Sequence, residues 1–381
     1  MTEWRGTVAD GGRSGGMATR IETGEAADGP GRVWRPKRVL ITRSAREHAH
    51  GRAIAARALA LGSVVVELPG DRLALDLPDD PRRAYATAKA TLAVVVAPPS
   101  KRKLQPIAPS ADWRVDLAEG CPAHCGYCYL AGSLKGPPIV RAYANLDEIM
   151  GGLPDYLGRG QVTSRSVRRM DEGTTFEASC YTDPLGIEPA TGSLSALVSA
   201  FGAWEADAQL RFTTKYDDVG PLLDLDHRGR TRMRASVNPT GYARFEGGTS
   251  PVAARLVALR RMAEAGYKIG LTIAPIIAAD GWERAYGQLI ADVADALAGL
   301  PGADLTVELI THRYTPGSKA VLESWYPGSA LDMGAAGRTE KRTKFGSLKY
   351  VYDADVMRAL RGFFEAEIAR MLPDARILYW T

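Results

Sequence analysis

Three of the chain's four cysteines lie within eight residues, as Cys121-Pro-Ala-His-Cys125-Gly-Tyr-Cys128. A cubane iron–sulfur cluster has four irons, and each iron takes a thiolate ligand. Three thiols at this spacing can bind three irons and leave the fourth open to another ligand. The spacing therefore predicts a loop that binds a 4Fe–4S cluster, and the open iron suits a cluster that carries out chemistry better than one that only transfers electrons.

The spacing resembles the signature of the radical S-adenosylmethionine (SAM) superfamily, in which SAM chelates the open iron through its amino and carboxylate groups. A structural zinc site is an alternative, but it needs a fourth ligand and usually a second Cys or His pair. No two histidines lie at such a spacing beside Cys180; they are His48, His50, His124, His227 and His312. Four cysteines in 381 residues also disfavour a disulfide framework.

Composition sets the broad class without naming a partner. Hydrophobic residues make up 45% of the chain, as in a globular protein with a core. There is no run of about 18 apolar residues that could span a membrane, and no secretion signal, so we expect a cytoplasmic protein. The net charge of +4 permits a nucleic-acid surface but does not require one.

The first part of the chain divides into a tail and a small domain. Residues 1–32 lack a periodic apolar pattern and are predicted to be a disordered tail. Residues 33–110 predict a small α/β domain with strands at Val39–Thr42, Ser63–Glu67 and Thr91–Val96 and a helix over 45–61. The stretch from Pro98 to Pro109 is interpreted as a linker.

Residues 111–381 alternate strand and helix patterns. Helices are predicted over Pro251–Ala265, with Ser250 as the N-cap and Gly266 at the end, and over Trp282–Ala298. Repeated strand–helix units predict a parallel sheet with right-handed crossovers. The fold class is therefore α/β, with a partial (β/α)6 TIM-type barrel. Its six predicted strands are Arg114–Ala118, Thr174–Ser179, Gln209–Thr214, Thr231–Val237, Lys268–Ala274 and Asp304–Thr311.

Polar side chains follow several of these strands. The cysteine motif comes after the first strand, where such folds place active-site loops. Cys180, Lys215 and Ser236 lie at the ends of the second, third and fourth strands, and His312-Arg313 follow the sixth. We expect these strand ends to converge on one mouth.

At this point the chain resembles a known family, spore photoproduct lyase, a group of radical SAM enzymes of DNA repair. The resemblance covers residues 33 to 381. It begins with the cluster loop Gly120–Leu130 and continues in order through Phe176–Asp183, Arg211–Lys215, Arg234–Asn238, Gly248–Pro251, Ala265–Tyr267, Ile273–Pro275, Gly281–Glu283, His312-Arg313 and Ile377–Thr381.

The resemblance implies a mechanism. A 4Fe–4S cluster on the three motif cysteines would cleave SAM to a 5′-deoxyadenosyl radical, which takes the C6 hydrogen from a methylene-bridged thymine dimer. Cys180 matches the family's hydrogen donor, and Tyr129 and Tyr127 would relay the reduction of its thiyl radical. The competing interpretations are an inert buried thiol for Cys180 and simple packing around the cluster for the two tyrosines.

The same matching assigns binding residues. Thr182, Lys215 and Ser236 would contact SAM. Lys344, Lys349 and Tyr350 lie in a segment that resembles the family's DNA-facing hairpin, although a solvated basic surface is the alternative for this run. The implied partners are damaged DNA and an electron donor such as flavodoxin or ferredoxin, and we expect a monomer.

The sequence departs from the family pattern on the substrate side. Tyr181 adds bulk beside Cys180, and Lys344-Phe345 stands where Arg-Tyr is usual. Lys keeps the charge but loses the bidentate fork of Arg. In the cluster loop, Pro122, Ala123 and Gly126 also differ from the usual residues. Two alternatives stay open: a same-family radical SAM enzyme for a different damaged or modified nucleobase, and a noncatalytic iron–sulfur protein that binds nucleic acid.

Overall fold

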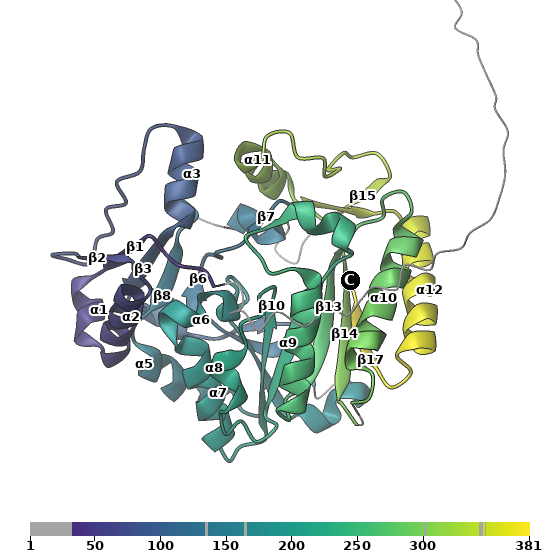
Figure 1. Ribbon diagram of the computed structural model, residues 1–381, viewed down its shortest axis with the longest axis horizontal. Helices are drawn as coiled ribbons and strands as arrows, with labels where there is room; N and C mark the ends of the chain where they lie inside the picture. The colour runs from purple at the N-terminus through teal and green to yellow at the C-terminus, as the bar shows by residue number, and fades with distance from the viewer. Residues whose placement is uncertain (1–32, 134–135, 164–165, 301, 343–345, 347) are drawn as a thin grey trace, which may run out of the picture. The chain divides into compact units, whose positions relative to one another are not determined.

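A curved, open sheet of eight strands forms the centre of the structure, a computed structural model that describes residues 33–133, 136–163, 166–300, 302–342, 346 and 348–381 (Figure 1). Six neighbouring strands are parallel and follow chain order, which confirms the predicted partial barrel. An antiparallel strand and a seventh parallel strand extend its two edges. The strand order is β17 (Arg376–Trp380), β14 (Leu305–Thr311), β13 (Lys268–Ile276), β11 (Thr231–Val237), β10 (Ala208–Thr214), β9 (Thr174–Ala178), β5 (Ala111–Val115) and β4 (Gln105–Ile107).

Helices cover the outer face of this sheet (Figure 1). Alternate strand residues such as Phe212 and Met233 are buried against apolar helix residues such as Leu197 and Leu259. These helix positions recur every three or four residues, the spacing of one face of an α-helix. The helices from α6 onward are α6 (Pro184–Thr191), α7 (Ser193–Ala203), α8 (Gly220–Leu223), α9 (Val252–Glu264), α10 (Trp282–Leu297), α11 (Pro316–Trp325) and α12 (Ala354–Met371).

The inner face of the sheet is charged. Glu308 on β14 accepts hydrogen bonds from Arg211 at 3.1 Å and from Arg234 at 2.5 Å, and Arg234 also pairs with Glu177. All four side chains are at most 5% exposed. Buried charges are tolerated when they are paired and hydrogen-bonded, so the network fills the half-barrel with mutually neutralising groups.

A second sheet precedes and flanks the half-barrel. Its first four strands are parallel and its last is antiparallel, in the order β2 (Val64–Glu67), β1 (Arg38–Ile41), β3 (Thr91–Val95), β8 (Val140–Tyr143) and β6 (Ala118–Glu119). The helices of this region are α1 (Arg43–Glu47), α2 (Ala49–Ala60), α3 (Pro81–Lys89), α4 (Pro99–Arg102) and α5 (Leu146–Gly151). Two of its strands come from after residue 110, and the boundary predicted there stays a prediction.

Four local expectations differ from the structure. The predicted helix over 45–61 is two helices, because His48 has an extended backbone between α1 and α2. The predicted linker contains α4 and β4, and the predicted strand over 114–118 is divided between β5 and β6 in different sheets. Ser250 does not cap α9: its hydroxyl donates to Asp217 at 2.5 Å, and Pro251 is the N-cap.

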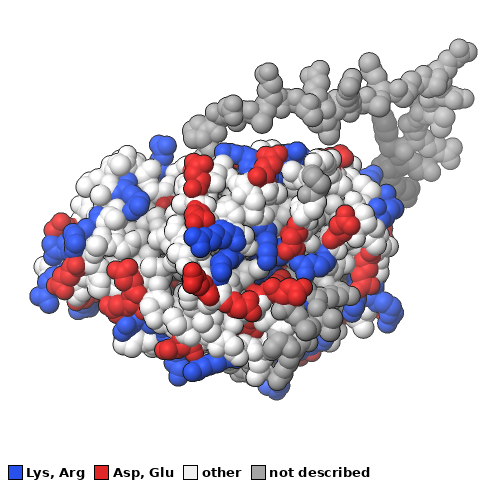
Figure 2. Space-filling model, turned by 90° about the horizontal axis from the view of Figure 1, so that it is seen from below, with Lys and Arg blue, Asp and Glu red and all other residues white. Residues whose placement is uncertain are grey.

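The predicted tail over 1–32 lies outside the described residues. Within the described part of the chain, no helix is long and apolar enough to cross a membrane. Figure 2 shows Lys and Arg interspersed with Asp and Glu on the face seen from below, so no single sign of charge dominates there.

Candidate active site

The cysteine loop lies at the carboxyl end of the parallel strands and is fixed at both ends. Gly120 has a φ of +81°, and a side chain there would place its Cβ 2.1 Å from the carbonyl oxygen of Ile139. Beyond it, β7 (His124–Cys125) pairs with β12 (Glu246–Gly247), and the Gly126 amide donates to Phe245 at 2.8 Å. These contacts hold the loop between two distant parts of the chain.

Two lysines give the three thiols a positive environment. The Lys89 ammonium is buried and donates to the carbonyl oxygens of Cys121 (2.7 Å) and Ala123. Burial raises the pKa of Cys121 to about 12, which Lys89 opposes, and Lys215 opposes the rise at Cys125. Iron would deprotonate such thiols outright.

The donor set fits a 4Fe–4S cluster, because three thiolates and the cluster core carry net negative charge that both ammonium groups face. No group of three or more His, Cys, Asp or Glu side chains in the described ranges is arranged to hold a single metal ion. All four cysteines are free and partly exposed.

Lys215 and Ser236, two residues predicted to contact SAM, lie together at the mouth. The Lys215 ammonium donates to the Ser236 hydroxyl and to Glu246, each at 2.9 Å, and lies 5.5 Å from the ring centre of Tyr127. The Tyr127 hydroxyl also donates to Glu246. Although burial raises the pKa of Glu246, Lys215 and Arg255 lower it to about 2, so the carboxylate is ionised.

Thr182, the third residue predicted to contact SAM, has a buried hydroxyl oxygen with no hydrogen-bond partner among the described residues. Such an atom normally finds a partner, so its position suits an additional ligand. The next residue, Asp183, caps α6 and accepts hydrogen bonds from the Lys215 amide and the Thr214 hydroxyl, both at 2.7 Å. Asp183 therefore ties Thr182 to the strand that carries Lys215.

A residue with a strained backbone, Ser179, lies between the end of β9 and Cys180. Ser179 has a φ of +52°, unusual for a residue with a side chain, and is held by hydrogen bonds with Val115 (2.7 Å) and Leu117 (2.9 Å). Burial and the nearby Asp116 raise the pKa of Cys180 well above its usual value. The thiol therefore keeps its hydrogen at neutral pH.

An arginine shapes the surroundings of Cys180. The Arg114 guanidinium lies 4.5 Å from the ring centre of Tyr181 and donates to Asp116 at 2.9 Å. Burial raises the pKa of Asp116 to about 6, although Arg114 lowers it. Tyr181, the bulky departure seen in the sequence, therefore packs under a cation beside the thiol.

Tyr129 lies near a second group of positive charges. The Arg313 guanidinium is 5.3 Å from its ring centre. Strands β15 (Arg338–Arg342) and β16 (Leu348–Tyr352) form the predicted hairpin, with Lys341 opposite Lys349. Burial lowers the pKa of Lys349, and Arg313 and Lys341 lower it further.

The other predicted hairpin residues have different outcomes. Tyr350 stacks on Tyr314 with ring centres 5.1 Å apart and donates to Glu340 at 3.0 Å. Lys344 lies outside the described residues. At the end of β14, His312 is buried and contacts Arg338 at 3.1 Å.

Sequence reasoning missed Lys89, Glu246, Arg114 and Asp116. Lys89 and Glu246 contact the cysteine loop from positions 32 and 119 residues away in the chain. Arg114 contacts Tyr181, which follows a different strand. Charged residues of this kind are normally on the surface. The Gly248–Pro251 resemblance, two residues after Glu246, marked one of these neighbourhoods, and the predicted strand over Arg114–Ala118 contained two of the missed residues without assigning them a role.

A half-barrel whose first strand leads into a three-cysteine loop, with Lys215 and Ser236 at the same mouth, defines a radical SAM enzyme. The family model for spore photoproduct lyase matches residues 34–381. The chain belongs to the spore photoproduct lyase family. It is 38% identical over 348 residues to the spore photoproduct lyase of Geobacillus sp. (strain Y412MC61), covering 91% of this chain and 98% of that protein. The lyase of Bacillus subtilis (strain 168) is 37% identical over 298 residues, with 78% and 84% covered.

Solved structures agree with this assignment. A spore photoproduct lyase complexed with dinucleoside spore photoproduct superimposes with a TM-score of 0.83 at 36% identity, covering 91% of this chain and 99% of that one. A variant of spore photoproduct lyase with bound AdoMet and the same dinucleoside gives a TM-score of 0.82 at 35% identity, with the same coverage.

Proposed function

We propose that this chain is a SAM-dependent lyase that repairs the methylene-bridged thymine dimer in DNA. The observation that carries the proposal is that the cysteine loop, the Lys215–Ser236 pair and Cys180 all follow or end strands of one half-barrel. The solved relatives that hold the dinucleoside lesion support the choice of substrate. Cys121, Cys125 and Cys128 would hold the cluster, which with SAM would supply the radical chemistry that removes the C6 hydrogen of the lesion.

In this proposal Cys121, Cys125 and Cys128 bind the cluster, and the residues at the mouth hold SAM. The Lys215 ammonium, which already contacts Glu246 and Ser236, would also pair with the SAM carboxylate. The Ser236 hydroxyl accepts a hydrogen bond from Lys215 and can donate its own hydrogen to the ligand. The buried Thr182 hydroxyl gains the partner that it lacks.

Cys180 donates hydrogen to the thymine radical left after the bridge breaks. Its environment supports this role, because burial keeps the thiol protonated while the side chain remains partly exposed. Tyr129 would give a hydrogen atom to the thiyl radical, and Tyr127 would restore Tyr129. The hydrogen carried by 5′-deoxyadenosine would return to Tyr127, with regeneration of SAM, so the cycle consumes no outside reductant. Glu246, which accepts the hydrogen bond of the Tyr127 hydroxyl, can hold the phenolic proton while the tyrosine is oxidised.

The hairpin would face the DNA. Lys349, with Arg313 and Lys341 nearby, supplies positive charge for phosphates, and Tyr350 and Lys344 would help to hold the extruded lesion. An acidic carrier such as flavodoxin or ferredoxin would reduce the cluster in the cytoplasm. The enzyme would act as a monomer, with a boundary near residue 110 between a small domain and the half-barrel.

The test is anaerobic. The reconstituted protein is given dithionite, SAM and the dinucleotide form of the lesion, and products are followed by mass spectrometry. We expect restored thymidylyl-thymidine together with iron and sulfide bound to the protein. Cys125→Ala should lose both the cluster and the activity. Formation of 5′-deoxyadenosine from SAM without repair would point to another damaged base. The absence of 5′-deoxyadenosine would contradict the enzyme assignment.

A further inference from the structure

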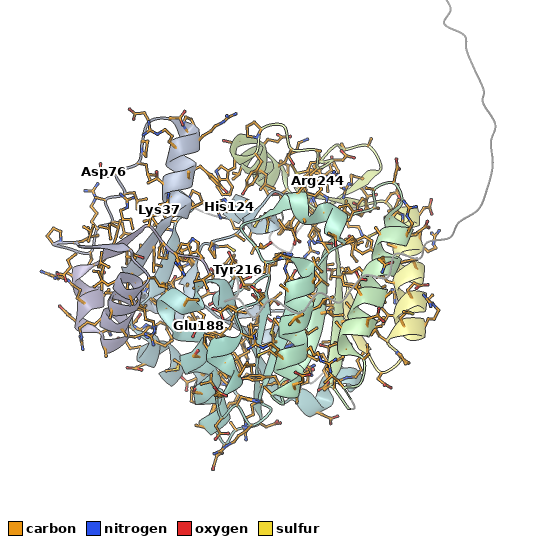
Figure 3. All side chains as sticks on the ribbon, viewed as in Figure 1. Lys37, Asp76, His124, Glu188, Tyr216 and Arg244 are labelled. Atoms are coloured by element: carbon orange, nitrogen blue, oxygen red, sulfur yellow. The ribbon has the colours of Figure 1, made fainter. Side chains whose placement is uncertain are left out.

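A surface groove of about 530 Å³ adjoins the cysteine loop on its outer side. Helix α3 and the end of helix α11 border it, and Figure 3 shows His124 near the gap between these helices. Arg244 also lines the groove. The groove exposes aromatic rings from both helices, Tyr85 from α3 and Trp325 and Tyr326 from the end of α11. These three aromatic residues are not part of the site described above.

The floor of the groove is the loop that carries the cluster ligands. His124 and Gly126, which flank Cys125, both line it. A Cβ at Gly126 would lie 3.9 Å from the Tyr326 ring, so the wall of the groove touches the loop directly. The β7–β12 pairing continues this floor to Phe245.

Hydrogen bonds connect the aromatic wall to the same loop. The Tyr85 hydroxyl is 3.0 Å from His124 Nδ1 and 2.5 Å from the Tyr326 hydroxyl. The Tyr85 and Trp325 rings are 5.3 Å apart. A surface that contacts these rings is thus separated from Cys125 only by packed, hydrogen-bonded side chains.

The charge of the groove has one sign. Among its lining residues in the described part of the chain are two arginines, Arg82 and Arg244, and no Asp or Glu. Both arginines are exposed, and neither forms an ion pair within the described ranges. Exposed, unpaired cations at the rim of an aromatic groove favour a partner with a negative surface.

We propose that this groove is the docking site of an acidic one-electron carrier protein that reduces the cluster. The inference rests on the proposed function, because only a bound cluster needs such an electron. One electron leaves the reduced carrier and enters the cluster; the carrier is oxidised by one electron, and no bond is formed or broken. A groove of this size suits the small, transient interfaces of electron-transfer complexes.

A DNA backbone fits this groove less well. Nucleic-acid affinity comes from many phosphate contacts, and the groove provides two cations. Its rim continues as the uncharged segment Pro327–Ala330. Meanwhile Arg313, Lys341 and Lys349 form a separate positive group around the hairpin. An electron carrier needs access to the cysteine loop, and that is what the groove offers.

The experiment compares two reductants in the holoenzyme. Formation of 5′-deoxyadenosine from SAM is measured with an acidic flavodoxin in its fully reduced form. It is measured separately with dithionite, which is small enough to need no docking surface. In Arg82→Glu/Arg244→Glu we expect the flavodoxin-driven rate at low salt to fall by about tenfold or more, since charge reversal removes steering. The dithionite-driven rate should stay within about twofold. Flavodoxin binding, followed by interferometry, should weaken in parallel.

The matched control is Arg358→Glu/Arg361→Glu on α12, which changes the same charge on exposed residues outside the groove and should affect neither rate. If the double reversal folds poorly, the milder Arg82→Gln/Arg244→Gln takes its place and should give a smaller loss in flavodoxin-driven rate and binding.

Unchanged flavodoxin binding and rate would overturn the proposal. So would an equal loss of dithionite-driven repair in duplex DNA, which would assign the groove to the substrate. No dithionite-driven deoxyadenosine in the unmodified protein would instead refute the proposed function.

Discussion

At the scale of single residues, the site depends on charges that are buried together. Glu246 is 4% exposed and contacts Lys215 and Tyr127, while Arg255 lies 2.7 Å away. A buried carboxylate is tolerated because these cations neutralise it. Cys180 is the opposite case, since burial beside Asp116 keeps its thiol neutral. Desolvation raises the pKa of both groups. At Glu246 the neighbouring cations outweigh it, whereas at Cys180 it decides the pKa.

Cys180→Ala should keep the cluster and SAM cleavage but lose clean repair. The lesion radical would have no hydrogen donor and would be diverted into side products. Mass spectrometry of the nucleotide products and of deoxyadenosine separates these two steps. A clean thymidylyl-thymidine product from this variant would remove Cys180 from the mechanism.

Glu246→Gln should destabilise the fold at neutral pH by about 3 kcal/mol, because the native pKa of about 2 lies below the ordinary 4.5. A lowered native pKa contributes stability above pH 4.5 that is lost as the pH falls toward 2. The difference between the variant and the unmodified protein should therefore shrink to about half near pH 3. Urea unfolding at both pH values measures it, and a difference that does not change with pH would contradict the assignment.

At the scale of elements, the hairpin brings like charges together. Antiparallel pairing sets Lys341 opposite Lys349, and Arg313 approaches from the end of β14. Like charges directly opposite each other destabilise a sheet. Stacking of Tyr350 on Tyr314 offsets part of this cost. A hairpin that keeps unfavourable cations is expected to use them for a ligand.

Lys349→Glu should weaken binding to duplex DNA that contains the lesion, and should reduce the dependence of log K on log salt by about one or more ions. Repair of the free dinucleotide should change little, because it carries few phosphates. Fluorescence anisotropy across a salt series gives the slope. An unchanged slope would show that Lys349 does not meet a phosphate.

At the scale of the whole molecule, the inside of the half-barrel is held by ions instead of apolar layers. Glu308, on the sixth strand of the barrel, links Arg211 and Arg234 from the third and fourth, and Arg234 reaches Glu177 on the second. Each of the four lies on a different strand. The network therefore ties together strands that span most of the sheet.

Glu308→Gln should lower the free energy of unfolding by about 3–5 kcal/mol, because Arg211 would be left buried without the carboxylate that it contacts and Arg234 would keep only Glu177. Urea denaturation measures the change. The control is Glu365→Gln, whose exposed pair with Arg361 on α12 should be worth less than about 1 kcal/mol. Equal effects of the two substitutions would show that the inner network does not stabilise the fold.

Particular elements show how far local patterns reach. The strand over Thr231–Val237 was predicted to the residue, since its apolar residues alternate with polar ones at the period of a strand. The break at His48 and the division of the strand after Arg114 were not predicted. In the second case the contact that decides the backbone comes from another part of the chain, because β6 pairs with β8.

The sequence by itself determined the cysteine loop, the repeated strand–helix order and the placing of Cys180, Lys215 and Ser236 at the ends of successive strands. These are properties of short segments, in which the number of residues between two positions largely fixes how far apart they lie in the structure. Only the tertiary structure decided that Lys89 lies under the loop, that Glu246 joins Tyr127 to Lys215, and that Tyr85 meets Tyr326 across 241 residues. Such pairs form because desolvated charges and hydroxyls must find partners, and folding alone brings those partners within reach.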